Sequence, residues 1–291
     1  MKRPMITRLF ATALLSGAAA SAFAVSLGSQ SVLVVEDGTG KILLEKNANT
    51  IVPIASLTKL MTAMVVLDAK ANMDEPIKVD KDDVDLLKHS TSRVPVGATL
   101  SRRDVLQLAL MSSDNRAAAS LARTYAGGPT AFAAAMSAKI KALGMTQTVI
   151  EEPTGLSPQN RSTAADLVKM ATAAATYPEI TRITTDAKDT ISINGRNVEY
   201  HNTNRLVGAK GWDIGLSKTG YTLEAGRCLI MRITSAGKKA TLVLLNARAS
   251  STRLVDALNI RRLLSGDDTP EVVRHVSLRH HKAAKSRKRR A

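Results

Sequence analysis

The spacing of hydrophobic positions changes along the chain, and each spacing predicts a different kind of element. Residues 31–35 and 41–45 are short apolar-rich runs on either side of the turn sequence Asp-Gly-Thr-Gly at 37–40, which predicts a β-hairpin. From residue 56 to residue 67 nearly every position is apolar over a helical length, which predicts a helix buried on all sides. We expect the rest of the chain to be organised around this helix.

Helical patterns continue through the next hundred residues. After a polar stretch at 72–100 we expect four further helices, at 101–111, 117–125, 129–143 and 163–175. Ser101 with Asp104, and Thr163 with Asp166, have the spacing of helix-capping pairs. Residues from about 70 to about 180 are therefore predicted to form a mostly helical subdomain.

Strand patterns return after residue 190. Residues 190–200 alternate around an Asn-Gly pair, which is a strong hairpin signal. Three strands joined by short turns follow at 213–221, 227–235 and 240–246, and short connections make such neighbours antiparallel. A last helix is expected at 252–264. The pattern predicts an α/β fold class, with an antiparallel sheet made from both chain ends, flanked by helices, and the helical subdomain inserted between them.

Composition indicates the class of protein, and the N-terminal sequence predicts its cellular location. Hydrophobic residues make up 44% and charged residues 23% of the chain, which is ordinary for a globular protein. Lys2, Arg3 and Arg8 precede a short apolar run, which ends at the small-residue sequence Ala-Phe-Ala at 22–24. We expect residues 1–24 to be a cleaved signal peptide, residues 25–266 to be the mature domain, and the protein to be extracytoplasmic, in the periplasm.

The net charge of +16 is concentrated at the ends of the chain. Eight basic residues and no acidic ones lie from Arg274 onward, and three more basic residues lie in the leader, so the body is only mildly basic. This distribution argues against a nucleic-acid-binding protein. Residues 267–291 are expected to be a disordered tail, which is either a solvated end or an electrostatic attachment to an anionic envelope surface.

Three short polar motifs fall at the ends or edges of the predicted elements. They are Ser56-Leu57-Thr58-Lys59, Ser113-Asp114-Asn115 and Lys218-Thr219-Gly220. Ser56 and Lys59 are one helical turn apart, so the hydroxyl and the amine can form a nucleophile and its base. Alone, this pair is more often a helix cap followed by a solvent-reaching lysine. Gly220 lies within a strand, which is typical where a ligand runs close against a sheet edge.

The three motifs, in this order, resemble those of penicillin-binding proteins and serine β-lactamases. Segments 152–163, 201–206, 217–222 and 224–229 extend the resemblance to the low-molecular-mass D-alanyl-D-alanine peptidases. Within that family the chain is most similar to the endopeptidase branch that includes penicillin-binding proteins seven and eight. The resemblance covers about residues 31–265 and implies a β-lactamase/D,D-peptidase-like fold.

The resemblance also implies a role for each motif. Ser56 would attack the carbonyl between two D-residues of a peptide cross-link, and Lys59 would accept its proton. The nearby charge of Lys218 would lower the pKa of Lys59. Ser113 would relay a proton to the leaving amine, and Asn115 would hold Lys59 and a substrate amide.

The third motif would bind and polarise the substrate. Lys218 and Thr219 would bind a substrate carboxylate, or that of a β-lactam inhibitor. Gly220 belongs to the same binding edge, and the backbone N–H groups of Tyr221 and Ser56 would form the oxyanion hole. The resemblance implies no metal and no cofactor, and the five histidines show no spacing typical of a zinc peptidase.

Three alternatives to an endopeptidase remain open. A D-alanyl-D-alanine carboxypeptidase of this fold usually continues into a second domain and an amphipathic anchor, whereas only the basic tail follows Gly266. A class A β-lactamase needs a glutamate to activate water, and Glu151 or Glu152 lies at a suitable distance from Ser113, but in a different sequence context. A non-catalytic envelope-binding module would not need a nucleophile beside a base. The preferred hypothesis is a serine endopeptidase that acts on peptidoglycan stem peptides and is acylated by β-lactams.

Overall fold

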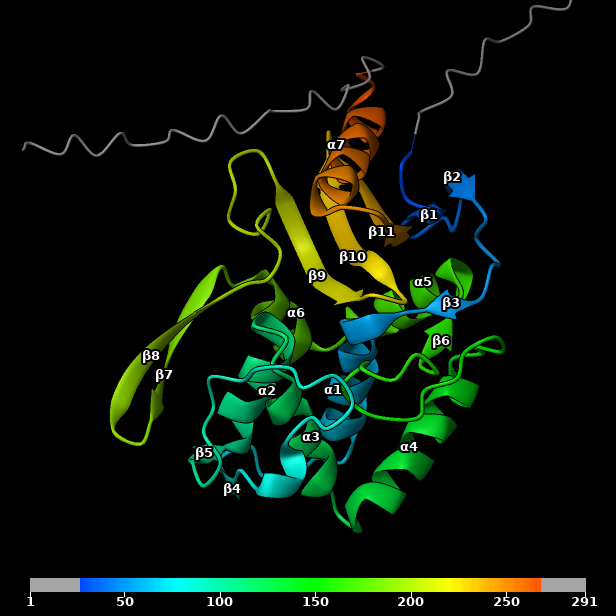
Figure 1. Ribbon diagram of the computed structural model, residues 1–291. Helices are drawn as coiled ribbons and strands as arrows, with labels where there is room; N and C mark the ends of the chain where they lie inside the picture. Colours follow the sequence, from blue (N-terminus) through cyan, green and yellow to red (C-terminus); the bar gives the residue numbers. More distant parts are fainter. Residues whose placement is uncertain (1–26, 268–291) are drawn as a thin grey trace, which may run out of the picture.

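The computed structural model describes residues 27–267 (Figure 1). The predicted signal peptide and all but the first residue of the predicted basic tail lie outside the described residues. Among residues 27–267, no helix is both long enough and apolar enough to cross a membrane.

An antiparallel sheet joins the two ends of the described chain, as predicted. Its strands in spatial order are β2 (Ile42–Lys46), β1 (Ser31–Glu36), β11 (Lys238–Ala247), β10 (Gly226–Ser235) and β9 (Asp213–Thr222). Strand β1 pairs with β11 along its whole length, so the first and last strands hold each other in place. Strand β9 forms an edge of this sheet and carries the third polar motif.

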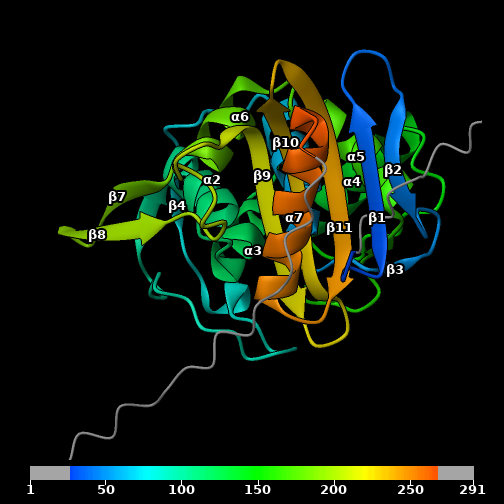
Figure 2. The same cartoon turned by 90° about the horizontal axis from the view of Figure 1, so that it is seen from above.

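The two faces of the sheet pack against different helices. Helix α7 (Ser250–Ser265) lies over β10 and β11 on one face, while α5 (Ala164–Ala174) lies on the other (Figure 2). Side chains alternate between the faces, so Leu229 packs on the α7 side and Ile230 packs on the side of the other helices. Because Leu229 is paired with Thr219 and Ile230 with Lys218, the register sends these two motif residues to opposite faces.

Helix α1 (Thr58–Asp68) is the centre of the larger core. Every side chain from Thr58 to Val66 is buried, which confirms the predicted all-round burial. The other helices that surround it in the lower half of Figure 1 are α2 (Arg102–Met111), α3 (Asn115–Arg123) and α4 (Gly128–Ala142). Ser101 and Thr163 cap α2 and α5 through hydrogen bonds to the backbone N–H groups of Asp104 and Asp166.

The structure also contains elements that the sequence pattern does not predict. Helix α6 (Pro178–Thr185) is short and rich in β-branched residues, which have low helix propensity, so its signal is weak. Two small sheets pair β3 (Val52–Pro53) with β6 (Arg161–Ser162), and β4 (Pro76–Lys78) with β5 (Thr99–Ser101). The predicted Asn-Gly hairpin is present as β7 (Lys188–Ile193) and β8 (Arg196–His201), and projects from the body in Figure 1.

Candidate active site

The first motif brings a hydroxyl and an amine together at the start of α1. Ser56 lies in a single 3-10 turn, Ala55–Leu57, which leads directly into α1. The Nζ atom of Lys59 lies 2.9 Å from Ser56 Oγ, 2.7 Å from Asn115 Oδ1 and 2.6 Å from the carbonyl oxygen of Thr154. A neutral amine in this position can donate to Asn115 and Thr154 while its lone pair faces the Ser56 hydroxyl. The geometry therefore suits proton transfer from Ser56 to Lys59.

Burial is what lowers the pKa of the Lys59 amine. The side chain is 1% exposed, and loss of hydration lowers its pKa to about 8. The carboxylates of Glu152, Asp114 and Asp85 act in the opposite direction. The expectation that the charge of Lys218 would be the cause is therefore corrected: desolvation is the largest effect on Lys59.

The second motif lies in a tight connection between α2 and α3. Ser113 has a φ of 60°, and Asp114 caps α3 by accepting a hydrogen bond from the N–H of Ala117 at 2.9 Å. Asn115 is the first residue of α3, and its Nδ2 donates to Ser90 Oγ at 2.8 Å. This contact fixes the amide orientation, so that Oδ1 faces Lys59.

The third motif divides its side chains between two faces of β9. Lys218, which is 1% exposed, points toward the helices and donates to Ser113 Oγ at 2.8 Å. Burial, together with the charge of Lys59, holds its pKa well below the usual lysine value. Thr219 faces the other side, where its hydroxyl donates to Thr203 Oγ1 at 2.7 Å. Lys218 and Thr219 were expected to share a carboxylate site, but only Thr219 lines the cavity described below.

Gly155 and Gly220 both pack against the peptide bond between Ala55 and Ser56. A Cβ atom on Gly220 would lie 3.1 Å from the Ser56 nitrogen, so β9 passes directly against this peptide. A Cβ on Gly155, which has a φ of +86°, would lie 2.0 Å from the carbonyl oxygen of Ala55. The close approach of β9 brings Tyr221, the residue after Gly220, to the same cavity as Ser56.

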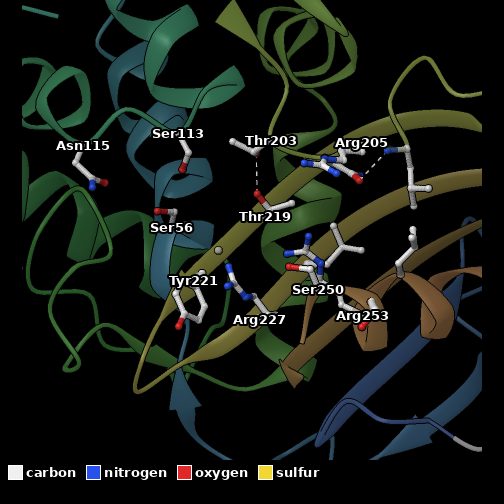
Figure 3. Close-up of a pocket in the computed structure, with 16 residues that line it drawn as sticks. Ser56, Ser113, Asn115, Thr203, Arg205, Thr219, Tyr221, Arg227, Ser250 and Arg253 are labelled. Atoms are coloured by element: carbon white, nitrogen blue, oxygen red, sulfur yellow. Dashed lines mark hydrogen bonds between the residues drawn. The ribbon is translucent and has the colours of Figure 1, made fainter. Parts of the chain in front are cut away.

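A cavity of about 630 Å³ runs from Ser56 along β9 and β10 to the first turn of α7 (Figure 3). Ser56, Ser113 and Asn115 lie at one end, and Arg253 and Ser250 at the other. Pockets of about 300–1,000 Å³ are typical of small-molecule sites, so the cavity has room for several residues of a peptide.

Sequence reasoning did not identify Thr203, Arg227 or Arg253 as parts of this site. Arg227 could have been found from strand alternation, because it faces the same side as Leu229, which is paired with Thr219. Arg253 has no local signal, since its place depends on how α7 packs over the sheet. Thr203 comes from the irregular segment between β8 and β9.

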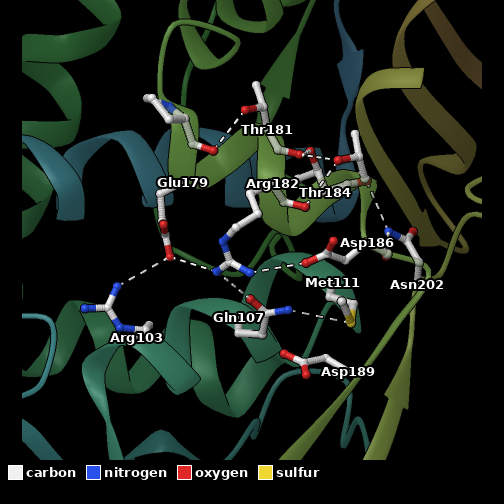
Figure 4. Close-up of polar contacts among 12 residues, drawn as sticks. Arg103, Gln107, Met111, Glu179, Thr181, Arg182, Thr184, Asp186, Asp189 and Asn202 are labelled. Carbon is white, nitrogen blue, oxygen red and sulfur yellow. Dashed lines mark hydrogen bonds and ion pairs between the residues drawn. The ribbon is translucent and has the colours of Figure 1, made fainter. Parts of the chain in front are cut away.

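That segment is held by polar contacts with α2 and α6 (Figure 4). The Asn202 amide donates to the carbonyl oxygens of Thr184 and Asp186 at 3.1 Å and 3.0 Å. The N–H of Thr203 donates to the carbonyl oxygen of Met111, near the end of α2. The loop that contains Ser113 and the residue whose hydroxyl contacts Thr219, Thr203, are therefore both held at the C-terminal end of α2.

The glutamates considered as water-activating bases do not line the cavity. The Glu152 carboxylate accepts hydrogen bonds from the backbone N–H groups of Thr154, Gly155 and Ser157 within its own loop. It also accepts from the Asn160 amide at 3.0 Å. Glu151 is exposed and receives the Ser157 hydroxyl. The carboxylate of Glu152 therefore orders the loop that presents the Thr154 carbonyl to Lys59, and the class A β-lactamase alternative loses its base.

Within residues 27–267, no group of three or more histidine, cysteine, aspartate or glutamate residues is arranged to hold a metal ion. The thiol of Cys228 is buried in β10, and burial raises its pKa to about 11. This thiol is therefore unreactive at neutral pH.

Comparison with known proteins gives matches over most of the chain. The family model Peptidase S11, described as D-alanyl-D-alanine carboxypeptidase, matches residues 18–249. The D-alanyl-D-alanine endopeptidase of Pseudomonas aeruginosa is 48% identical over 82% of this chain and 77% of its own length. That of Escherichia coli is 43% identical over 92% of this chain and 88% of its own length.

A solved structure has the same fold. The Streptomyces K15 DD-transpeptidase superimposes with a TM-score of 0.77 at 26% identity, over 83% of this chain and 98% of that one. The matched relatives and the site geometry agree, and the chain belongs to the S11 family of D-alanyl-D-alanine peptidases.

Proposed function

We propose that the protein is a serine D-alanyl-D-alanine endopeptidase, which cleaves peptide cross-links of peptidoglycan through an acyl-enzyme on Ser56. The observation that carries the mechanism is the position of Lys59 Nζ, 2.9 Å from Ser56 Oγ and held by Asn115 and Thr154. The similarity to two D-alanyl-D-alanine endopeptidases supports the choice of reaction.

Acylation begins with proton transfer from Ser56 to Lys59. The Ser56 oxygen attacks the D-alanyl carbonyl, and a tetrahedral oxyanion forms. The backbone N–H groups of Ser56 and Tyr221 stabilise this oxyanion, and one such donor is typically worth about 3–4 kcal/mol. Proton transfer needs little reorganisation around Lys59, because Ser56 Oγ, Asn115 Oδ1 and the Thr154 carbonyl oxygen are in place before substrate binds.

The leaving amine needs a proton when its bond to the carbonyl breaks. Ser113 is placed to give that proton, since its hydroxyl accepts from Lys218 Nζ and can be recharged by it. The proton that Lys59 took from Ser56 replaces the one that the Ser113–Lys218 pair has lost, which leaves the Lys59 amine neutral again. Water then attacks the acyl-enzyme and gives a proton to Lys59. That proton passes to Ser56 Oγ as the ester bond breaks and the acyl peptide is released. Lys218 thus acts behind Ser113, and its own side chain does not line the cavity.

The carboxylate beside the scissile amide binds at Thr219 and Arg253. Both line the cavity, and Arg253 comes from the first turn of α7. Burial and the charge of Arg227 lower the pKa of the Arg253 guanidinium from its usual value, so an incoming carboxylate would relieve an uncompensated charge. A β-lactam carboxylate would use the same contacts, and β-lactams would acylate Ser56.

The proposed location is the periplasm, from the signal-peptide pattern at residues 1–24. The basic residues from Arg274 onward would attach the protein to an anionic envelope surface. Removing them should weaken attachment in a salt-dependent manner and leave cleavage in solution intact.

The proposed reaction is tested with cross-linked muropeptide dimers and with uncross-linked pentapeptides. The purified protein is expected to convert dimers into monomers, and the Ser56→Ala variant to leave them intact, as followed by chromatography and mass spectrometry. Release of terminal D-alanine with intact dimers would show a carboxypeptidase instead. Multiple turnovers of benzylpenicillin without a lasting adduct would show a β-lactamase.

A further inference from the structure

The cavity that contains Ser56 has a strongly cationic lining. Arg205, Arg227 and Arg253 line it, and among residues 27–267 no aspartate or glutamate does. In the described part of the chain, three other buried or partly buried arginines are paired with a carboxylate, whereas Arg116 and Arg261 donate to the carbonyl oxygens of Val94 and Gly211. The carboxylate pairs are Arg102–Glu75 at 2.6 Å, Arg123–Asp83 at 2.7 Å and Arg232–Asp37 at 2.7 Å.

Arg227 and Arg253 differ from the three carboxylate-paired arginines: within the described residues, Arg253 donates only to the carbonyl oxygen of Cys228, at 3.1 Å. Both are half-buried, and neither forms an ion pair with a carboxylate in the part of the chain that the structure describes. Leaving a charge partly desolvated without a counter-ion is unfavourable. Two such charges in one cavity indicate that the ligand supplies the anions.

The guanidinium of Arg227 is held in a defined orientation. Its Cζ lies 3.4 Å from the centre of the Tyr221 ring, and the two residues are paired across β9 and β10. Stacking uses the face of the guanidinium, so its N–H groups project from the edge of the plane. None of the hydrogen bonds found among residues 27–267 uses them. A planar donor fork with free edges suits a carboxylate.

The leaving side of the reaction faces this cationic end. Ser113, which protonates the leaving amine, lies near Thr219, and the cavity continues from there toward Arg227 and Arg253 (Figure 3). A carboxypeptidase releases D-alanine, which has one carboxylate. A cross-link releases a whole peptide strand, which has further carboxylates in addition to the one beside the reacting amine.

We propose that Arg227 is a specificity residue that binds a second carboxylate of the leaving peptide strand, and so favours cross-links over a terminal D-alanine as the substrate. This inference rests on the proposed function, because it concerns the leaving strand of the same reaction. Arg253 with Thr219 takes the carboxylate beside the scissile amide, and Arg227 takes one further along the strand.

The test compares kcat/KM of the parent and the Arg227→Gln variant on three synthetic substrates. The first is a cross-linked tetrapeptide dimer. The second is the same dimer with every carboxylate of the leaving strand amidated, except the one beside the scissile amide. The third is an uncross-linked pentapeptide. Arg196→Gln, at an exposed position at the start of β8, is the matched control.

Arg227→Gln is expected to lower the ratio of dimer to pentapeptide kcat/KM by roughly tenfold to a hundredfold, the loss typical of a hydrogen bond to a charged group. Amidation should lower the parent's rate on the dimer by a similar factor, and the variant should not distinguish the two dimers. Arg196→Gln should keep the parent's ratio.

Two results would overturn the inference. One is an unchanged ratio in Arg227→Gln while the parent cleaves dimers. The other is an equal loss on the free and amidated dimers, which would show that Arg227 acts only by supporting Tyr221. A parent protein that cleaves neither dimer would instead overturn the proposed function, and the role of Arg227 with it.

Discussion

Replacing Lys59 with glutamine should lower the rate of acylation by benzylpenicillin about 10⁴-fold. Glutamine can still donate to Asn115 Oδ1 and the Thr154 carbonyl, which Lys59 Nζ contacts at 2.7 Å and 2.6 Å, but it cannot accept the Ser56 proton. The rate is measured by stopped-flow or by quantifying the adduct over time. Lys78→Gln, an exposed lysine in β4, is the control and should acylate at the parent rate.

The same role of Lys59 predicts the pH dependence of the parent. Only the neutral amine can act as a base, and its pKa is about 8, so the acylation rate should rise with pH and level off above that value. Because burial has lowered this pKa from 10.5, a useful fraction of the amine is neutral near pH 7. Unchanged acylation in Lys59→Gln, or a flat profile between about pH 6 and 9, would remove Lys59 from the role of base.

Replacing Gly155 with alanine should both destabilise the protein and slow acylation. The φ of +86° is unfavourable for alanine, at roughly 1–2 kcal/mol, and the new Cβ would lie 2.0 Å from the Ala55 carbonyl oxygen. The Ala55–Ser56 peptide must move to relieve this clash. A shift of about 1 Å at a reacting group can cost about 100-fold in rate. We expect a loss of stability of about 2–4 kcal/mol in denaturant unfolding, with at least that loss of rate.

Gly38→Ala separates the clash from the backbone strain. Gly38 has a φ of +85°, and a Cβ there would have no atom within 4 Å. This variant should lose only the cost of the backbone conformation and keep the parent's acylation rate. Equal stability losses in the two variants, with acylation intact in Gly155→Ala, would show that the Ala55–Ser56 peptide is not held by its contact with Gly155.

Local sequence patterns predicted most of the helices and strands. The all-round burial of α1, the two hairpins and the three antiparallel strands follow from spacing and turn residues, because those signals act over short distances. The pairing of Ser56 with Lys59 is equally local, since one helical turn fixes it. Helix α6 was missed because tertiary packing, rather than the helix propensity of its β-branched residues, stabilises it.

Contacts between distant segments could not be worked out from spacing alone. The family resemblance named Ser113 and Lys218, but strand register and helix packing are what bring them to 2.8 Å and place Lys218 behind Ser113, outside the cavity lining. The Thr154 carbonyl and the Glu152 carboxylate act through a loop whose shape depends on many backbone hydrogen bonds. Arg253 reaches the site only because α7 lies across the sheet.

The position of the covalent adduct shows directly whether Ser56 is the nucleophile. The purified protein is incubated with benzylpenicillin, digested, and mapped by tandem mass spectrometry, with Ser56→Ala in parallel. We expect one adduct of the mass of benzylpenicillin on Ser56, and none on the variant, whose thermal unfolding should match that of the parent. An adduct on another residue, or an equal adduct on a folded Ser56→Ala variant, would contradict the assignment of Ser56 as the nucleophile.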